Sequence, residues 1–204
     1  EIIVYPGIYT GADEYAVIDL LGKSLWIHSS SGQDKTIIDG EGLRRCLVSG
    51  GALSGNSIVE GFTFTNGFGV DGGGIYINGG GLEITDCAVT SNIAQNIGGG
   101  ICFVNSDSIL NNCTISHNTV DGSIDEYGGR AWGGGVAILG SSSPQFYNCD
   151  ISNNFATNAD SYYAQCLGGG VSIIDSFSNN NEEVVKLKGL YVGGRLDPIK
   201  QARD

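Results

Sequence analysis

The sequence predicts an all-β solenoid, a parallel β-helix with three short strands in each coil. Two repeated sequence motifs lead to this prediction. The first is a glycine triplet followed by Ile or Val, which begins at residues 72, 98, 133 and 168. The second runs from a Cys to an Asn, at residues 87 to 92, 113 to 118 and 149 to 154. Repetition at a nearly constant interval is typical of repeat architectures and decides the fold before any local feature does.

Apolar residues within each repeat recur at every second position, which is the period of a strand and not of a helix. Residues at the same place in successive repeats should stack about 4.8 Å apart, the spacing of hydrogen-bonded strands. Each coil then covers the apolar face of its neighbour. The expected inward-facing ladders are Ile75/Ile101/Val136/Val171, Ile84/Leu110/Phe146 and Val89/Ile115/Ile151.

The corners of the coil are predicted from the glycine and asparagine positions. Each triplet lies where a tight corner enters a strand, and glycine allows that corner without steric penalty. Asn92, Asn118 and Asn154 should stack at another corner, where side-chain amides bond along the stack as in other stacked-strand structures.

The six cysteines are divided into two groups by the repeat. Cys87, Cys113 and Cys149 occupy one inward position and are expected to be free thiols, because parallel side chains have poor disulfide geometry. The pairing state of the other three stays open, and one of them, Cys102, is expected to face outward. These three are Cys46, Cys102 and Cys166.

Domain organisation follows from where the repeat stops. One continuous parallel β-helix is predicted over residues 1–176. Residues 177–204 have neither the glycine triplet nor the motif that runs from Cys to Asn. They carry five basic residues, which are Lys186, Lys188, Arg195, Lys200 and Arg203. This second segment is a cap, a last coil or a boundary tail, and a cap is favoured because solenoid ends need covering.

Composition excludes some classes of function. The formal net charge of −12 argues against a nucleic-acid partner, because no basic stripe replaces phosphate counterions. No apolar run approaches the ~18 residues of a membrane span. The chain contains no Met, which is expected of a processed part of a longer chain.

Two further patterns precede the glycine triplets and the motifs that run from Cys to Asn. They are Ile-x-Val-x-Pro-Gly-x-Tyr at residues 2–9 and Gly-Phe-Thr-Phe-Thr-Asn-Gly at 61–67, and together these motifs form a recognisable set. This set resembles the right-handed parallel β-helix repeat proteins, which include pectate-lyase-like folds and repeat regions of bacterial surface proteins such as polymorphic outer membrane proteins. The resemblance covers about residues 1–176. It implies a right-handed coil and an extracellular or cell-surface location, with carbohydrate as the commonest substrate class.

Catalytic residues typical of that group are scarce in the repeats. Of the two histidines, His28 and His117, the second occupies a repeat position filled by Ser91 and Asn153, which indicates a solvent-facing corner. The acidic segment 39–42 is interpreted as a turn. Arg130 is the one candidate for the base of a polysaccharide lyase.

Two insertions supply the candidate site. Residues 120–132 and 155–167 leave consecutive coils at equivalent positions and should stack on one edge. Their aromatic side chains and one Arg suit sugar binding by stacking and hydrogen bonding, and their carboxylates suit Ca²⁺, the one cofactor expected. The predicted ligand-binding residues are Tyr127, Arg130, Trp132, Tyr162 and Tyr163. The predicted Ca²⁺ ligands are Asp121, Asp125, Glu126 and Asp160.

The sequence therefore predicts a non-enzymatic extracellular or surface module, structural or adhesive, that binds a polysaccharide or cell-surface glycan along the insertion edge. The alternative is a polysaccharide lyase or related enzyme acting on acidic polysaccharide. A lateral contact with another protein is also expected through the outward apolar stripe of Val104, Leu139 and Ile174, because exposed apolar patches mark contacts.

Overall fold

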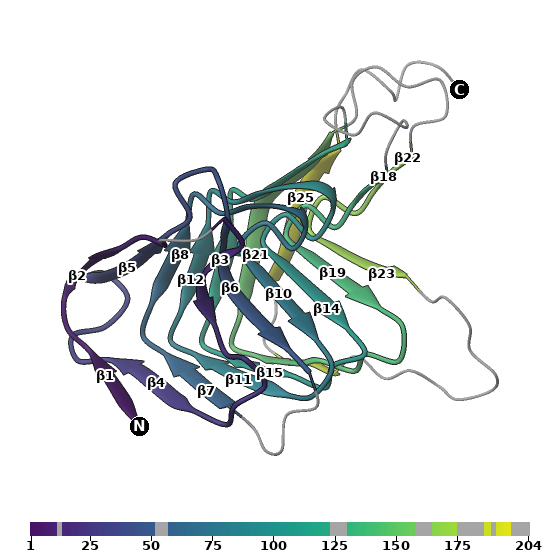
Figure 1. The fold of residues 1–204 in the computed structure, drawn as a ribbon. Helices are drawn as coiled ribbons and strands as arrows, with labels where there is room; N and C mark the ends of the chain where they lie inside the picture. Colours follow the sequence, from purple (N-terminus) through teal and green to yellow (C-terminus); the bar gives the residue numbers. More distant parts are fainter. Residues whose placement is uncertain are drawn as a thin grey trace.

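The computed structural model describes residues 1–11, 14–51, 57–122, 130–157, 165–174, 186–188 and 191–196, with the backbone alone at 130, 165–167, 174, 186–188 and 191–196. These residues form a parallel β-helix of three sheets around one apolar core (Figure 1). Every strand pair in it is parallel, as the repeat predicts. No helix in the described ranges is long and apolar enough to span a membrane.

The three sheets extend along the solenoid axis from the N-terminal end at the left of Figure 1 towards β23 at the right. Sheet A has seven strands: β1 (Ile2–Val4), β4 (Trp26–Ser29), β7 (Ser57–Glu60), β11 (Leu82–Thr85), β15 (Ile109–Asn111), β20 (Gln145–Tyr147) and β24 (Lys186–Lys188). Sheet C has six: β3 (Ala16–Asp19), β6 (Arg45–Gly50), β10 (Ile75–Asn78), β14 (Ile101–Val104), β19 (Val136–Leu139) and β23 (Val171–Ile174).

Sheet B is larger because the chain adds a strand after the Asn corner. Its first row is β2 (Gly7–Tyr9), β5 (Thr36–Asp39), β8 (Thr63–Thr65), β12 (Ala88–Thr90), β16 (Thr114–Ser116), β21 (Asp150–Thr157) and β25 (Tyr191–Leu196). The added row is β9 (Phe68–Asp71), β13 (Ile93–Ile97), β17 (Thr119–Asp121), β18 (Arg130–Trp132) and β22 (Gln165–Leu167). A complete coil thus has the three expected strands and a fourth that leads into the next triplet.

The predicted inward ladders are confirmed by the strand register. Ile75 pairs with Ile101, Ile84 with Leu110 and Val89 with Ile115, and the ladders continue through the neighbouring coils. The larger core side chains are fully buried, among them Phe62, Phe64, Phe103 and Phe146. The boundary that the sequence predicts at residue 176 stays a prediction, and beyond it β24 pairs with β20 and β25 with β21.

The Asn ladder is also confirmed, and it runs through the inside of the corner. Asn92, Asn118 and Asn154 are all 0 % exposed. The Asn118 side-chain amide donates to Val89 O at 2.8 Å and to Asn154 Oδ1 at 3.0 Å. Asn118 Oδ1 in turn accepts from the backbone and side-chain amides of Asn92 at 3.0 and 2.9 Å. The ladder ends at Gly67, whose amide donates to Asn92 Oδ1 at 2.8 Å.

All three glycines of a triplet are sterically required, each for a different reason. The first, such as Gly98, has a φ of 64°. A Cβ on the second, Gly99, would lie 2.4 Å from Gly134 O and 2.5 Å from Thr119 O. A Cβ on the third, Gly100, would lie 2.6 Å from Gly135 O and 2.8 Å from the Asn118 amide. Real Cβ atoms essentially never approach so closely, so the triplet and the Asn ladder form one close-packed corner.

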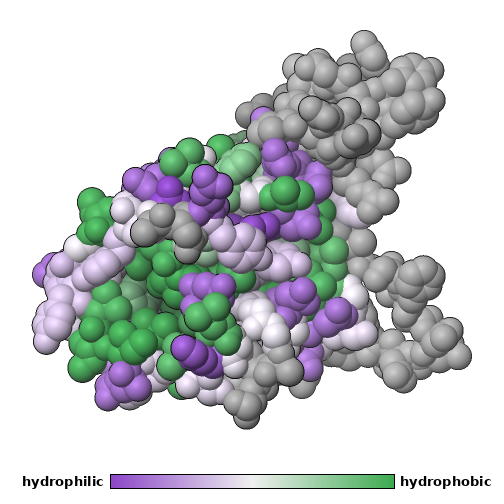
Figure 2. Space-filling model, viewed as in Figure 1, coloured by the Kyte–Doolittle hydropathy of each residue, from purple (hydrophilic) through white to green (hydrophobic). Residues whose placement is uncertain are grey.

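The N-terminal end of the solenoid exposes apolar surface (Figure 2, left). A cavity of about 410 Å³ opens there between β1, β2 and β3. It is lined mostly by apolar side chains, including Ile2, Val4, Ile18 and Ile27. The cavity is the interior of the coil seen from its open end.

Candidate functional site

The two insertions leave and return at the same edge in consecutive coils. The chain leaves along β17 in one coil and along the end of β21 in the next, with Val120 paired to Ala156. It returns along β18 and β22, with Trp132 paired to Leu167. The register thus confirms that the two insertions begin and end at equivalent positions of one edge, as the repeat predicts.

The preceding coil has no insertion and shows how the chain connects the same two positions at this edge without one. In β13, Ala94 pairs with Val120 and Ile97 pairs with Trp132. Gln95 and Asn96 alone therefore connect the positions that the next coil connects with residues 121–131. The insertions are additions to a coil that closes without them, since the shorter coil contains the same four strands and triplet.

Only part of the predicted site lies within the described residues. Asp121 ends β17 and is half-buried, and Trp132 ends β18 and is half-buried. The backbone of Arg130 begins β18. Six predicted residues lie outside the described ranges: Tyr127, Tyr162, Tyr163, Asp125, Glu126 and Asp160. Among the residues that are described, no group of three or more His, Cys, Asp or Glu side chains could hold a metal. The Ca²⁺ site thus stays a prediction.

Trp132 has a structural contact that the sequence does not indicate. It packs against a small cluster formed by Ile97, Cys102 and Ala137. Cys102 and Ala137 face away from the solenoid core yet are fully buried, since the ends of the strands in the added row of sheet B cover them. Cys102 therefore faces outward from sheet C, as expected, but beneath a second apolar layer.

The stripe predicted for lateral contact contributes to this layer. Val104 and Leu139 are partly buried and pack against the same cluster, while the side chain of Ile174 lies outside the described part of the structure. The lateral contact stays a prediction. The exposed apolar surface of Val104 and Leu139 is smaller than the sequence indicates.

Burial determines the chemistry of the thiols. Cys46, Cys87, Cys102, Cys113 and Cys149 are free and buried. Burial raises the pKa of the Cys46 and Cys87 thiols from 9.0 to about 12. Protonated buried thiols are poor nucleophiles and metal ligands, so Cys46 and Cys87 serve packing, as the inward ladder predicts for Cys87. Cys149 differs, because its hydrogen bond with Cys113 lowers the pKa of its thiol to about 7.

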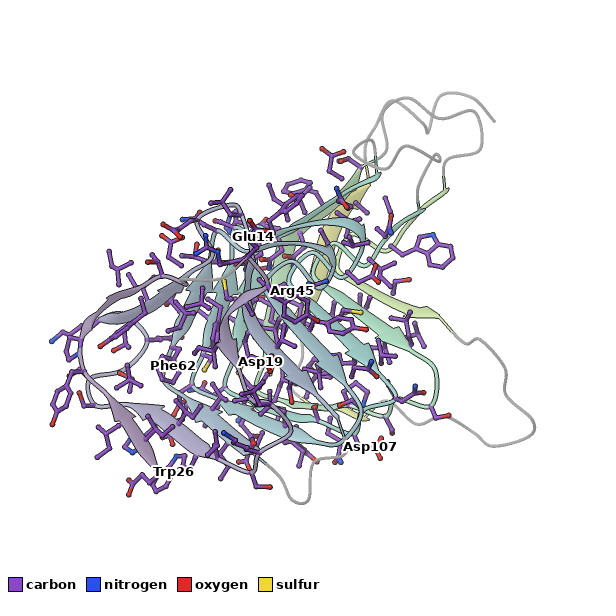
Figure 3. The ribbon with its side chains drawn as sticks, in the orientation of Figure 1. Glu14, Asp19, Trp26, Arg45, Phe62 and Asp107 are labelled. Atoms are coloured by element: carbon purple, nitrogen blue, oxygen red, sulfur yellow. The ribbon has the colours of Figure 1, made fainter. Side chains whose placement is uncertain are left out.

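Two surface groups are not indicated by the sequence. On the outside of sheet A, Trp26 stacks on His28 with ring centroids 4.5 Å apart. Trp26 Nε1 donates to Glu60 Oε2 at 3.3 Å, and His28 Nε2 lies 3.0 Å from Glu1 Oε1. Figure 3 shows Trp26 outside the ribbon and Phe62 inside it. The residues come from three consecutive coils with irregular spacing, so no sequence period brings them together.

The second group lies outside sheet C. The Arg45 guanidinium lies between two aromatic rings, 5.3 Å from the Tyr15 centroid and 5.2 Å from that of Tyr76. Its Nε donates to the carbonyl oxygen of Asp71 at 3.0 Å. Burial raises the pKa of the Asp71 carboxyl, and the positive charge of Arg45 opposes that rise.

The two remaining polar predictions are confirmed as structural. His117 is exposed at its corner with a φ of 58°. In the acidic turn, Asp39 Oδ1 accepts from the Glu41 amide at 2.8 Å and Glu41 pairs with Arg44 at 2.8 Å. These contacts stabilise the turn.

Comparison with known proteins agrees with the coil geometry. Residues 49–195 match the family model described as a right-handed beta helix region. No curated protein and no solved structure matches the chain. Because the match covers more than half of the chain and the structure has the same architecture, this protein belongs to the right-handed beta helix family.

Proposed function

We propose that this chain is a non-enzymatic β-helix module of the extracellular space or cell surface that binds a glycan along its insertion edge. The observation that carries the proposal is the register of the strands that flank the two insertions, which pair at equivalent positions in consecutive coils. Adjacent coils place the two insertions about 4.8 Å apart at their bases. Such spacing makes one composite surface from two loops that are far apart in sequence.

The composition of the insertions suits a sugar ligand. Residues 121–129 and 157–164 contain three tyrosines and four acidic residues, which are Asp121, Asp125, Glu126 and Asp160. Tyrosine rings stack on sugar faces, and carboxylates accept hydrogen bonds from hydroxyl groups. The contact of Trp132 with Ile97 and Cys102 anchors β18, the strand to which the chain returns after the first insertion.

The test removes the insertions without disturbing the coil. In one variant, residues 121–131 are replaced by Gln-Asn, the connection that the preceding coil uses. In the other, residues 157–166 are replaced in the same way, which leaves Leu167 at the position of Ile97. Circular dichroism and the melting temperature show whether each shortened protein keeps the solenoid.

A glycan array with the unaltered chain should show binding that both shortened variants lose. Ca²⁺ should raise the melting temperature of the unaltered chain and not that of the variants, if the acidic residues of the insertions hold the ion. Equal binding by a folded shortened variant would contradict the proposal. The chain could instead produce the absorbance of unsaturated uronates from an acidic polysaccharide in the presence of Ca²⁺. If Arg130→Ala abolished this absorbance, the chain would be a polysaccharide lyase and not a binding module.

A further inference from the structure

Arg45 occupies a position that is glycine in the coils that follow it. The register of β6 with β10 places Arg45 in the row of the second glycine of each triplet. An added Cβ at Gly73, Gly99 or Gly134 would lie between 2.2 and 2.4 Å from a carbonyl oxygen, so those coils have no room for a side chain. Arg45 is therefore a departure from the repeat, and its side chain lies on the outer side of sheet C (Figure 3).

The guanidinium of Arg45 is held in place from three sides. It lies between the rings of Tyr15 and Tyr76, whose centroids are 5.3 and 5.2 Å from its Cζ. Its Nε donates to the carbonyl oxygen of Asp71 at 3.0 Å, so Asp71 contributes its backbone and not its carboxylate to this bond. A guanidinium that is already oriented loses little rotamer freedom when a ligand binds to it.

A glycine in a neighbouring strand makes room for this arrangement. An added Cβ at Gly69 in β9 would lie 2.9 Å from Nε of Arg45 and 3.0 Å from its Cζ. The next two coils have Ala94 and Val120 in the row of Gly69. Gly69 and Arg45 thus depart from the repeat together, because the absence of a side chain at Gly69 provides the space that the guanidinium fills.

The outer end of the guanidinium has no hydrogen-bond partner in the part of the chain that the structure describes. Among those residues, the Arg45 side chain donates through Nε alone, and no carboxylate forms an ion pair with it. The two Nη groups are not buried, so they reach solvent beside Tyr15, which is 52 % exposed. They present paired N–H donors on a group that stays charged at every physiological pH.

The position of Arg45 relative to the insertion edge follows from the strand register. Asp71, which accepts from Arg45, pairs with Ile97, and Ile97 pairs with Trp132. Two steps between coils place Asp71 about 10 Å from Trp132 along the solenoid axis. Tyr76 and Trp132 also pack against the same buried cluster. The surface is therefore continuous from Arg45 to β18, the strand to which the chain returns after the first insertion.

We propose that Arg45 is the anion-binding residue of a subsite on the N-terminal side of the insertion edge, where it binds a carboxylate or sulfate group of a saccharide. The inference rests on the proposed glycan binding and adds the chemical class of the glycan. A guanidinium binds two oxygens of such a group through parallel N–H bonds. Because the chain has a net charge of −12, anions are repelled from most of its surface, so a bound anion indicates a specific site.

An NMR titration of the isotope-labelled whole chain tests the subsite directly. The probes are glucuronate, a sulfate ester of glucose and, as the uncharged probe, glucose, all at constant ionic strength. The Nε–Hε signal of Arg45 is identified by its absence in Arg45→Lys. This signal should shift in a saturable way with one or both charged sugars and not with glucose, and the sugar that shifts it identifies the bound group. The proposal is overturned if neither charged sugar shifts the signal.

Two variants separate the position of the guanidinium from its charge. Gly69→Ala keeps the charge but displaces the guanidinium, and Arg45→Lys keeps the charge but lacks the planar pair of donors. Both should weaken binding of the charged sugar about tenfold, as measured from the backbone amide signals of Asp71 and Tyr76. Lys35→Ala removes an exposed cation elsewhere and is the control, which should bind as before. Unchanged binding in Gly69→Ala and Arg45→Lys, or equal weakening in Lys35→Ala, overturns the proposal.

The glycan array separates this inference from the function on which it rests. Glycans that bind through the insertions without any response of the Arg45 signal contradict the anion subsite alone. A saturable response of Arg45 to a charged sugar, in a chain that binds no glycan on the array, contradicts binding along the insertions and leaves the subsite.

Discussion

The coils between residues 67 and 171 and the first coils of the solenoid reach the same fold in different ways. In the later coils the corner is a close-packed unit of glycine triplets and buried asparagines, with no room for an added methyl group. The first coils lack triplets and instead expose apolar side chains, an open cavity and the stacked pair of Trp26 and His28. The difference teaches that the repeat specifies the scaffold, whereas surface chemistry lies where the repeat is absent or interrupted.

The largest expected effect comes from adding one methyl group to the corner. Gly99→Ala should lower the free energy of unfolding by about 4 kcal/mol or more, because its Cβ would overlap two carbonyl oxygens that cannot move without breaking the coil. Urea unfolding followed by circular dichroism measures this change.

Gly50→Ala is the control from a first coil. No atom lies within 4 Å of its added Cβ, and its φ is not positive. Its free energy of unfolding should change by less than about 1 kcal/mol. Similar losses in Gly50→Ala and Gly99→Ala would show that the triplet corner is no more constrained than the first coils.

Removing one amide from the Asn ladder should have the next largest effect. Asn118→Ala leaves Val89 O and the Asn92 amides without their buried partner, which should cost about 3 kcal/mol. Asn112→Ala, at an exposed corner of the same coil, should cost about 1 kcal/mol, mainly because its φ is 52°. Thermal unfolding of the two proteins side by side tests the contrast, and equal melting temperatures would contradict it.

High pH should destabilise the coil that contains Cys87. Burial raises the pKa of Cys87 from 9.0 to about 12 in the folded protein. Below pH 9 the thiol is protonated in both states, so its full contribution to stability is present. Between pH 9 and 12 the unfolded chain loses the proton and the folded chain keeps it, so stability falls as pH rises.

The Cys87 thiol should lower the free energy of unfolding by about 1 kcal/mol between pH 9 and 10. Cys87→Ala should show a correspondingly smaller slope of stability against pH in urea titrations. A slope that does not change in this variant would mean that other groups cause the alkaline loss.

The smallest effect is expected at the surface of the first coils. Trp26→Ala should lower the free energy of unfolding by less than about 1 kcal/mol, because the ring is 42 % exposed. Trp132→Ala should cost about 2 kcal/mol, because that ring covers the buried Cys102 and Ala137. Acrylamide quenching of tryptophan fluorescence distinguishes the two rings, because each variant keeps only one of them. Quenching should be stronger in Trp132→Ala, which keeps Trp26, than in Trp26→Ala, which keeps Trp132.

The predicted parts of the fold are those in which each coil repeats the last. The ladders of Ile75, Ile84 and Val89 could be aligned without a structure, since stacked coils place equivalent residues side by side. The same alignment places both insertions on one edge. The fourth strand of each coil could not be found in this way, because residues 93–97 do not alternate regularly between apolar and polar.

The surface groups could not be predicted for a related reason. Arg45 meets Tyr15 and Tyr76 across coils of unequal length, and Trp26 meets Glu60 in the same manner. Without a constant period, no sequence separation indicates which side chains become neighbours. Trp132 was predicted from its neighbours in sequence as a ligand contact, whereas its packing partners lie in other coils.

The sequence by itself determined the parallel β-helix, its inward ladders, the Asn corner and the edge from which the insertions emerge. These follow from a local repeat that each coil satisfies in the same way. Only the tertiary structure decided that each glycine of the triplet is required and that Cys102 is buried beneath a second layer. The physical reason is that the distances between atoms of neighbouring coils depend on the assembled solenoid and not on any one segment.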